Sequence, residues 1–252
     1  MVKIQSKYYF LICLVLISLT KSFSASKDGD NILKKKSSFI STLPEAYQED
    51  FTELIQKLEK KSNNNEAYFL EHLFYKTHRK FLKQYRKHSA LQELFKEGVY
   101  DCVSGSLLYA SLLDHFDIAY DIVETDFHVF IIAYSTTGEE YILEATDPLY
   151  GFIKNERDIA EYKLKYQPRV GSFGLSSAIE IGDNTYFNGE ENTIYNHINL
   201  SQLGGLQYYN KGIEALNGKN YEQAFDMLAK AHELYPSERI TAILEICQSL
   251  AN

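Results

Sequence analysis

The chain has 252 residues, with 26 Lys or Arg against 34 Asp or Glu, so its formal net charge at pH 7 is −8. A chain this acidic has no basic stripe to neutralise a phosphate backbone, which argues against a nucleic-acid partner. Its length accommodates one domain of about 130 to 180 residues and a small appendage. We expect an α+β fold with a small C-terminal helical repeat.

The N-terminus has the pattern of a cleavable signal peptide. An uncharged apolar run at residues 8–19 follows two lysines and is too short to span a bilayer as a stable helix. Ser22 and Ser24 are small residues at positions −3 and −1 of a cleavage site before Ala25. We therefore expect residues 1–24 to be removed and the protein to be exported, periplasmic or secreted, without a stable membrane span. An uncleaved anchor is the alternative.

Cleavage at this position would leave two cysteines in the mature chain. It would also remove three lysines and no acid, so the net charge would move from −8 to −11. A disulfide between Cys102 and Cys247 is one alternative in an oxidising compartment. We favour two free thiols, because a cysteine that leads a helix and is followed by a histidine and an acid is better suited to nucleophilic catalysis than to a disulfide.

The first third of the mature chain is expected to be helical. Residues 25–38 are polar and predict a mobile leader. The apolar spacing over residues 44–61 predicts a helix with Thr42 as its N-cap. A second helical tract over residues 66–96, in two or three pieces, should pack against the helix that follows Cys102.

Three histidines lie in this second tract, but their spacing does not suit a metal site. His72, His78 and His88 are six and ten residues apart, so no two of them lie one turn apart on a helix face, and no cysteine joins them. The sequence predicts no metal and no cofactor.

Residues 98–147 contain a cysteine, a histidine and an acid in an order that can support nucleophilic catalysis. Apolar residues recur at spacings of three and four after Cys102, which predicts a helix that begins there. Unpaired N–H groups and the positive end of the helix dipole stabilise a thiolate at such a position, and the thiolate is the attacking form of cysteine. Asp101 lies beside it, where a negative charge opposes the thiolate.

Two β-rich runs, residues 127–134 and 141–146, follow the helix. Their alternation places His128 on the same face as Phe130, so the imidazole could be held at a strand start facing the Cys102 helix. The second run contains Glu144. An acid near the imidazole would fix its tautomer and stabilise the imidazolium.

The register of the two strands decides between Glu144 and Asp147 as that acid. Thr136-Thr137-Gly138 suits a three-residue hairpin loop with Gly138 in the left-handed conformation. That loop would place Glu144 on the His128 face as a diagonal neighbour. A four-residue loop would change the parity and favour Asp147 instead. We prefer Glu144.

The order of these residues resembles the transglutaminase-like branch of the papain-like superfamily. Such families have a helix led by the cysteine, a strand with the histidine and a strand with an acid, commonly in a D-P-T pattern that Glu144-Ala145-Thr146 occupies here. The resemblance covers roughly residues 66–152 and implies a papain-like core over residues 39–203.

The same resemblance implies a function. The protein would be an exported cysteine enzyme that performs acyl transfer or hydrolysis on an amide of a peptide or protein. Cys102 would be the nucleophile, His128 the general base and then acid, and Glu144 the orienting acid. An oxyanion hole would come from the Cys102 backbone N–H and one further donor.

A purely structural interpretation of Cys102 and His128 leads to a different class of function. A lone cysteine is more often a core residue, and a lone histidine at the edge of an apolar strand is more often structural. The alternative is therefore a non-catalytic exported binding module, in which a papain-like scaffold and the C-terminal helices bind a protein partner.

Residues 151–205 are harder to interpret. A short helical piece is expected at residues 156–162, with extended segments such as residues 176–182 and a turn at Asn188-Gly189. This region could line a substrate cleft, but we favour an irregular scaffold.

The tail, residues 204–252, resembles one tetratricopeptide repeat. Gly212, Tyr221, Ala224, Ala231 and Pro236 lie at or near the marker positions of that family. A closing helix is expected over residues 237–250.

A single repeat cannot bury its own apolar face, so the tail should dock on the main domain or on a protein partner. Leu216, Phe225 and Leu228 are the side chains that we expect to be buried there.

Overall fold

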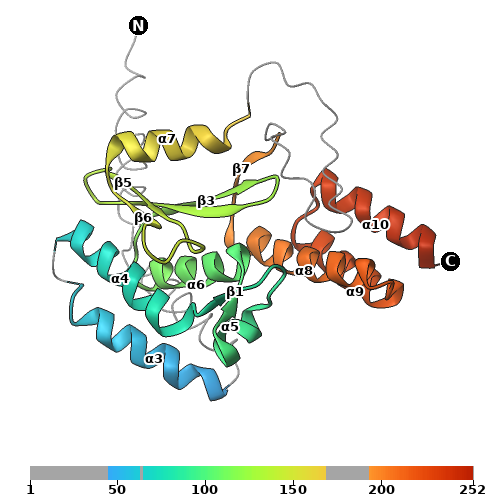
Figure 1. Ribbon diagram of the computed structural model, residues 1–252, viewed down its shortest axis with the longest axis horizontal. Coiled ribbons are helices and arrows are strands. Elements are labelled where there is room, and N and C mark those ends of the chain that lie inside the picture. Colours follow the sequence, from blue (N-terminus) through green and yellow to red (C-terminus); the bar gives the residue numbers. More distant parts are fainter. Residues whose placement is uncertain (1–44, 63–64, 169–192, 252) are drawn as a thin grey trace, which may run out of the picture. The chain divides into compact units, whose positions relative to one another are not determined.

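The computed structural model describes residues 45–62, 65–168 and 193–251 (Figure 1). All the described residues belong to one compact unit, Pro44–Asn252. The expected signal peptide, the leader and the Thr42 cap lie outside the described residues, as do the extended segment at 176–182 and the turn at Asn188-Gly189.

The fold is mixed α/β, and its five-stranded sheet is antiparallel, as expected. The strands of this sheet, in spatial order, are β6 (Phe152–Ile153), β5 (Glu140–Leu143), β4 (Val129–Tyr134), β3 (Tyr120–Thr125) and β7 (Tyr195–Ile198). Two short strands, β1 (Gln84–Tyr85) and β2 (Val99–Tyr100), pair in parallel beside it.

Eight helices occur in the described residues. They are α3 (Glu45–Glu59), α4 (Glu66–Phe81), α5 (Leu91–Glu97), α6 (Cys102–His115), α7 (Glu156–Tyr166), α8 (Leu200–Asn217), α9 (Tyr221–Leu234) and α10 (Glu238–Ala251). The second helical tract divides into α4 and α5, as expected, and α7 extends one turn beyond the expected piece. Within the described residues, no helix has the length and apolarity needed to cross a membrane.

Helix α6 is the buried centre of the unit, and every residue from Cys102 to Leu113 is buried. It lies against one face of the sheet, while α7 covers the other face (Figure 1). Gly105 permits a close approach, because a Cβ there would lie 2.7 Å from the Cβ of Ala145. The first turn of α6 therefore lies directly against the segment that follows β5.

The hairpin of β4 and β5 has the predicted register. Ile131 pairs with Leu143 and Tyr134 with Glu140. The loop has three residues, is closed by the Ser135 amide donating to the Glu139 carbonyl at 2.9 Å, and holds Gly138 at φ 86°. The loop length and the parity that favoured Glu144 over Asp147 are thus confirmed.

The imidazole of His128 shares a cleft with Cys102, but the rest of that β4 face does not turn toward α6. Phe130 and Ile132 pack with Ile159 of α7, on the face of the sheet opposite α6. A strand pattern shows which residues share a face but not which helix covers it. His128 also lies just before β4 rather than inside it, since the strand begins at Val129.

The sequence analysis missed β3, although it lies next to β4 in the sheet. It pairs with β4 from Tyr120 opposite Ala133 to Glu124 opposite Val129. A tight turn of Asp126 and Phe127 joins the two strands, because the Thr125 amide donates to the His128 carbonyl at 2.8 Å. The position of His128 therefore follows from the end of β3.

The C-terminal helices dock on the rest of the unit. Helices α8 and α9 cross closely at Gly212, where a Cβ would lie 2.7 Å from Cγ of Leu228. Leu216 and Leu228 are buried, as expected. Phe225 is only half-buried, and it lies on α9 beside the exposed residues Glu222 and Asp226. The expected boundary between residues 203 and 204 lies inside α8.

Candidate functional site

Cys102 is the first residue of α6 because Asp101 caps that helix. The Asp101 Oδ1 atom accepts from the Ser104 amide at 2.7 Å and from the Ser104 hydroxyl at 2.8 Å, and the Asp101 amide donates to the Ser104 hydroxyl at 2.9 Å. This reciprocal capping box fixes the start of the helix. Cys102 as a whole is 8% exposed.

The Asp101 carboxylate therefore has a structural function that its position in the sequence did not reveal. Burial raises the pKa of Asp101 above its usual value, and hydrogen bonds from Ser104 and Asn210 offset that rise only in part. The carboxylate oxygens accept hydrogen bonds from the first turn of α6 and from Asn210, so the Asp101 side chain serves as the N-cap of the helix.

His128 is held between the turn and a group of aromatic rings. Its amide donates to the Thr125 hydroxyl at 3.1 Å, and its imidazole stacks on Tyr166 of α7 with ring centroids 5.5 Å apart. Its Nε2 atom lies 2.5 Å from Oε2 of Glu144. Burial lowers the pKa of His128, but hydrogen bonds and charge from Cys102 and Glu144 outweigh burial and raise that pKa well above 6.5.

Glu144 follows β5 directly and is 5% exposed, but its carboxylate has four donors. Oε1 accepts from the Thr146 amide at 2.8 Å and from the Thr146 hydroxyl at 2.5 Å. Oε2 accepts from the Tyr162 hydroxyl and faces His128. Burial raises the pKa of Glu144, but hydrogen bonds and the charge of His128 lower it to about 2. The two residues form an ion pair in which Glu144 is buried and His128 is partly buried.

Asp147, the alternative acid, points into a turn instead. Its Oδ1 atom accepts from the amides of Leu149 at 3.0 Å and Tyr150 at 2.9 Å. The structure thus brings Cys102, His128 and Glu144 together and keeps Asp147 in the adjacent turn.

The sequence analysis missed two residues of the site, Tyr162 and Tyr166. Both lie on α7, where Tyr162 donates to Glu144 and Tyr166 stacks on His128. Their spacing from Ile159, three and seven residues, did place them on one helix face. Nothing local indicated that this face covers the imidazole.

Cys102 and His128 open onto one cleft with a water-accessible volume of about 80 Å³. The strand side of the cleft consists of the turn from β3 to β4. The opposite wall belongs to the C-terminal helices, through Leu206, Tyr209, Asn210 and Ile213 of α8 and Arg239 of α10. Among the described residues, this wall comes from the tail and not from the region at 151–205.

Two acidic residues of the cleft are paired inside the protein. The Glu124 carboxylate forms an ion pair with Arg239 at 2.5 Å. Asp126 accepts from the amide and hydroxyl of Thr193, each at 2.7 Å, and from the Ile194 amide at 2.9 Å. Neither carboxylate is available as a free anionic contact for a ligand.

Of the three histidines in the second tract, His88 lines the cleft, whereas the other two have different surroundings. His78 is buried, with Nε2 3.1 Å from the Ala145 carbonyl oxygen, and His72 stacks near Tyr68. The described residues contain no group of three or more His, Cys, Asp or Glu side chains able to hold a metal ion. Cys102 and Cys247 are free thiols, as favoured.

No protein-family model matches this chain, and comparisons with curated proteins and with solved structures gave no significant match.

Proposed function

We propose that the protein is an exported papain-like cysteine enzyme of the transglutaminase-like type, which performs acyl transfer or hydrolysis on an amide of a peptide or protein. One observation carries the proposal: a cysteine at a helix start shares a cleft with a histidine whose imidazole forms an ion pair with a buried carboxylate. This is the arrangement that activates a thiol nucleophile.

In the proposed reaction the Cys102 thiolate attacks the amide carbonyl carbon and a C–S bond forms. The C–N bond then breaks, and the leaving amine takes its proton from the His128 imidazolium. Water or an amine next attacks the thioester and gives its proton to His128, and the Cys102 thiolate leaves. Glu144 keeps the imidazole oriented through its 2.5 Å contact with Nε2.

The oxyanion of the tetrahedral intermediate needs donors near Cys102. The first proposed donor is the Cys102 backbone N–H in the first turn of α6. For the second we propose the Tyr85 hydroxyl, because Tyr85 lines the same cleft. Tyr85 is about half exposed; partial burial raises its pKa, and the charges of Cys102 and Asp101 add to that effect.

A non-catalytic binding module is the second candidate. Two observations favour it: Cys102 is buried, with only 8% of the residue exposed, and the cleft is small. A scaffold of this kind would hold a peptide without turnover.

The rate of Cys102 alkylation by iodoacetamide between pH 5 and 9 separates the two candidates. The enzyme should react at neutral pH faster than glutathione, and His128→Gln should slow the reaction by roughly tenfold or more, in the lower range for loss of a general base. Cys102→Ser identifies the modified thiol. Reaction of native Cys102 no faster than glutathione, or only after unfolding, would favour the binding module.

A further inference from the structure

The C-terminal helices contact the two sides of the cleft at separate points. Helix α8 reaches Asp101, which precedes the nucleophile, and α10 reaches the turn that precedes His128. Each of these two contacts joins residues that are more than 100 positions apart in the sequence.

We propose that α8 and α10 form a clamp that sets the separation of Cys102 and His128, with Asn210 and Arg239 as positioning residues. This inference rests on the function proposed above, since it assigns a role in that site to the helices that resemble a repeat. The clamp makes the tail part of the site rather than a detachable recruitment module.

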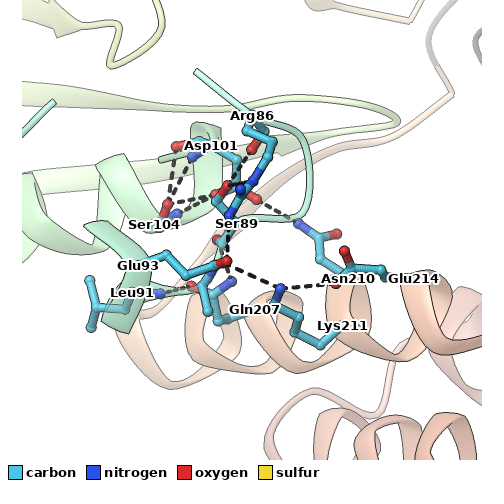
Figure 2. Close-up of polar contacts among 11 residues, drawn as sticks. Arg86, Ser89, Leu91, Glu93, Asp101, Ser104, Gln207, Asn210, Lys211 and Glu214 are labelled. Carbon is cyan, nitrogen blue, oxygen red and sulfur yellow. Dashed lines mark hydrogen bonds and ion pairs between the residues drawn. The ribbon is translucent and has the colours of Figure 1, made fainter. Parts of the chain in front are cut away.

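On the cysteine side, α8 is fastened to the segment before Cys102 along one face (Figure 2). Asn210 Nδ2 donates to Oδ2 of Asp101 at 3.2 Å, so one carboxylate joins α8 to the cap of α6. One turn earlier, Gln207 donates to the Ser89 carbonyl at 3.0 Å and accepts from the Leu91 amide at 3.1 Å.

On the histidine side, Arg239 of α10 holds the end of β3. Its Nη1 atom donates to the Asp126 carbonyl at 2.9 Å, and its Nη2 atom pairs with Glu124. Asp126 is the first residue of the turn that ends at His128. The guanidinium also lies 5.0 Å above the ring of Tyr209, which connects this contact to α8.

The burial of these groups favours positioning over simple stabilisation. Asp101 and Glu124 are 1% and 2% exposed, and the Arg239 side chain is 12% exposed. Buried ion pairs often add little stability compared with apolar residues of similar volume, and in some proteins their role is to fix a defined geometry. A clamp needs that geometry next to two groups whose reaction depends on their separation.

The first test compares Asn210→Ala and Arg239→Met with matched controls in the full-length protein. Asn217→Ala changes an exposed asparagine at the end of the same helix, and Lys230→Met removes a cation that lies 5.9 Å from the Tyr208 ring on the same helical unit. Alkylation of Cys102 at neutral pH should slow by roughly 10- to 100-fold in the clamp variants, as expected for a displacement of about 1 Å. The controls should stay close to the wild-type rate.

The pH profile of the same reaction adds a readout that a purely structural role would not move. Asp101 and His128 face Cys102, and Tyr85, Lys87, His88, Glu124, Asp126 and Arg239 also line the cleft. If the imidazole no longer stabilises the thiolate in the clamp variants, their alkylation rate should fall more at low pH than at high pH. The control variants should keep the wild-type profile.

Arg239→Met leaves the buried Glu124 carboxylate without its cation, with the Tyr235 hydroxyl still donating to it at 2.6 Å, and so could prevent folding. The double variant Glu124→Gln/Arg239→Met removes both charges and still lacks the donor to the Asp126 carbonyl. It should fold, as judged by circular dichroism, and should show the slow alkylation.

A distance measurement separates failure of the clamp from failure of the proposed function. In a His128→Cys background, dibromobimane should link Cys102 to the new cysteine quickly, and Asn210→Ala and the double variant should slow this link relative to Asn217→Ala. If wild-type alkylation does not depend on His128, the proposed function fails and cross-linking alone decides the clamp. If it does depend on His128 but the clamp variants alkylate and cross-link at control rates, the clamp is overturned and the function stands.

Discussion

The two sides of the cleft hold their reactive groups by different means. His128 lies in a network of side chains, where Glu144, Tyr162 and Tyr166 surround the imidazole with charge, a hydrogen bond and a stacked ring. Cys102 is placed by its backbone, through the capping box of Asp101. Removal of one charge should therefore be enough to misplace the His128 imidazole. Cys102, in contrast, should be misplaced only when the start of α6 moves.

The largest expected effect is the loss of the charge on the histidine side. Glu144→Gln should lower turnover by roughly 10²- to 10⁴-fold, because the imidazolium loses its partner and its orientation. Asp147→Asn is the control and should leave the rate nearly unchanged, since Asp147 binds turn amides. Rates of Cys102 alkylation should fall in the same order, and the reverse ranking would transfer the role to Asp147.

The same ion pair should make stability depend on pH. The pKa of Glu144 is lowered to about 2 in the folded protein, so its contribution is complete above pH 4.5 and is lost as the pH falls toward 2. It amounts to about 3 kcal/mol. The pKa of His128 is raised, so its contribution is complete below pH 6.5 and is lost as the pH rises through the higher folded value.

Urea unfolding across the pH range measures this dependence. The difference in unfolding free energy between wild type and Glu144→Gln should be greatest between about pH 4.5 and 6.5. A difference that does not change with pH would show that the pair is not ionised.

Tyr162→Phe sharpens the comparison by removing one hydrogen bond and no charge. It should lower the unfolding free energy by about 1.5 to 3 kcal/mol, the range for hydrogen bonds to ionised groups, and slow alkylation less than Glu144→Gln does. Tyr134→Phe is matched, because its hydroxyl donates to Asp121 at 2.7 Å on the same face of the sheet. Equal effects of both variants on the alkylation rate would remove Tyr162 from the site.

The smallest expected effect on stability is at Gly105, where α6 contacts Ala145 in the segment that follows β5. Gly105→Ala places a methyl group 2.7 Å from Ala145, which should cost about 1 to 3 kcal/mol through overpacking. Better helix propensity offsets up to about 1 kcal/mol of that cost. Gly204→Ala in α8 has no neighbour within 4 Å of the new Cβ and should be neutral or slightly stabilising. Thermal unfolding measures both, and a stabilised Gly105→Ala protein would contradict the close contact.

The parts of the site that could be predicted from the sequence are those specified by local patterns. The helix start at Cys102 followed from apolar spacing, and the hairpin loop followed from its third position, where Gly138 adopts the left-handed conformation. Together these local features favoured Glu144 over Asp147.

The remaining parts depend on contacts between distant segments. Glu124 is a charged residue in a buried strand, which weakens the β3 pattern, and it is buried because Arg239 pairs with it from 115 residues away. Tyr162 resembles any tyrosine on an amphipathic helix until α7 lies over the imidazole. The covering helix of a strand face is likewise set by chain topology, which explains why the pattern of β4 did not identify α7 as its cover.

The separation of these contacts along the chain has a consequence for the order of folding. His128 and Glu144 are 16 residues apart and are joined by a short hairpin, whereas Asn210 and Asp101 are 109 residues apart. Closing a short loop has a smaller entropic cost, and local contacts form sooner. During synthesis from the N-terminus, we expect the histidine and its carboxylate to meet while the wall formed by α8 and α10 has not yet been made. The thiol would then acquire its complete surroundings only when the last 50 or so residues fold onto the sheet, so that reactivity would appear late in the maturation of the chain.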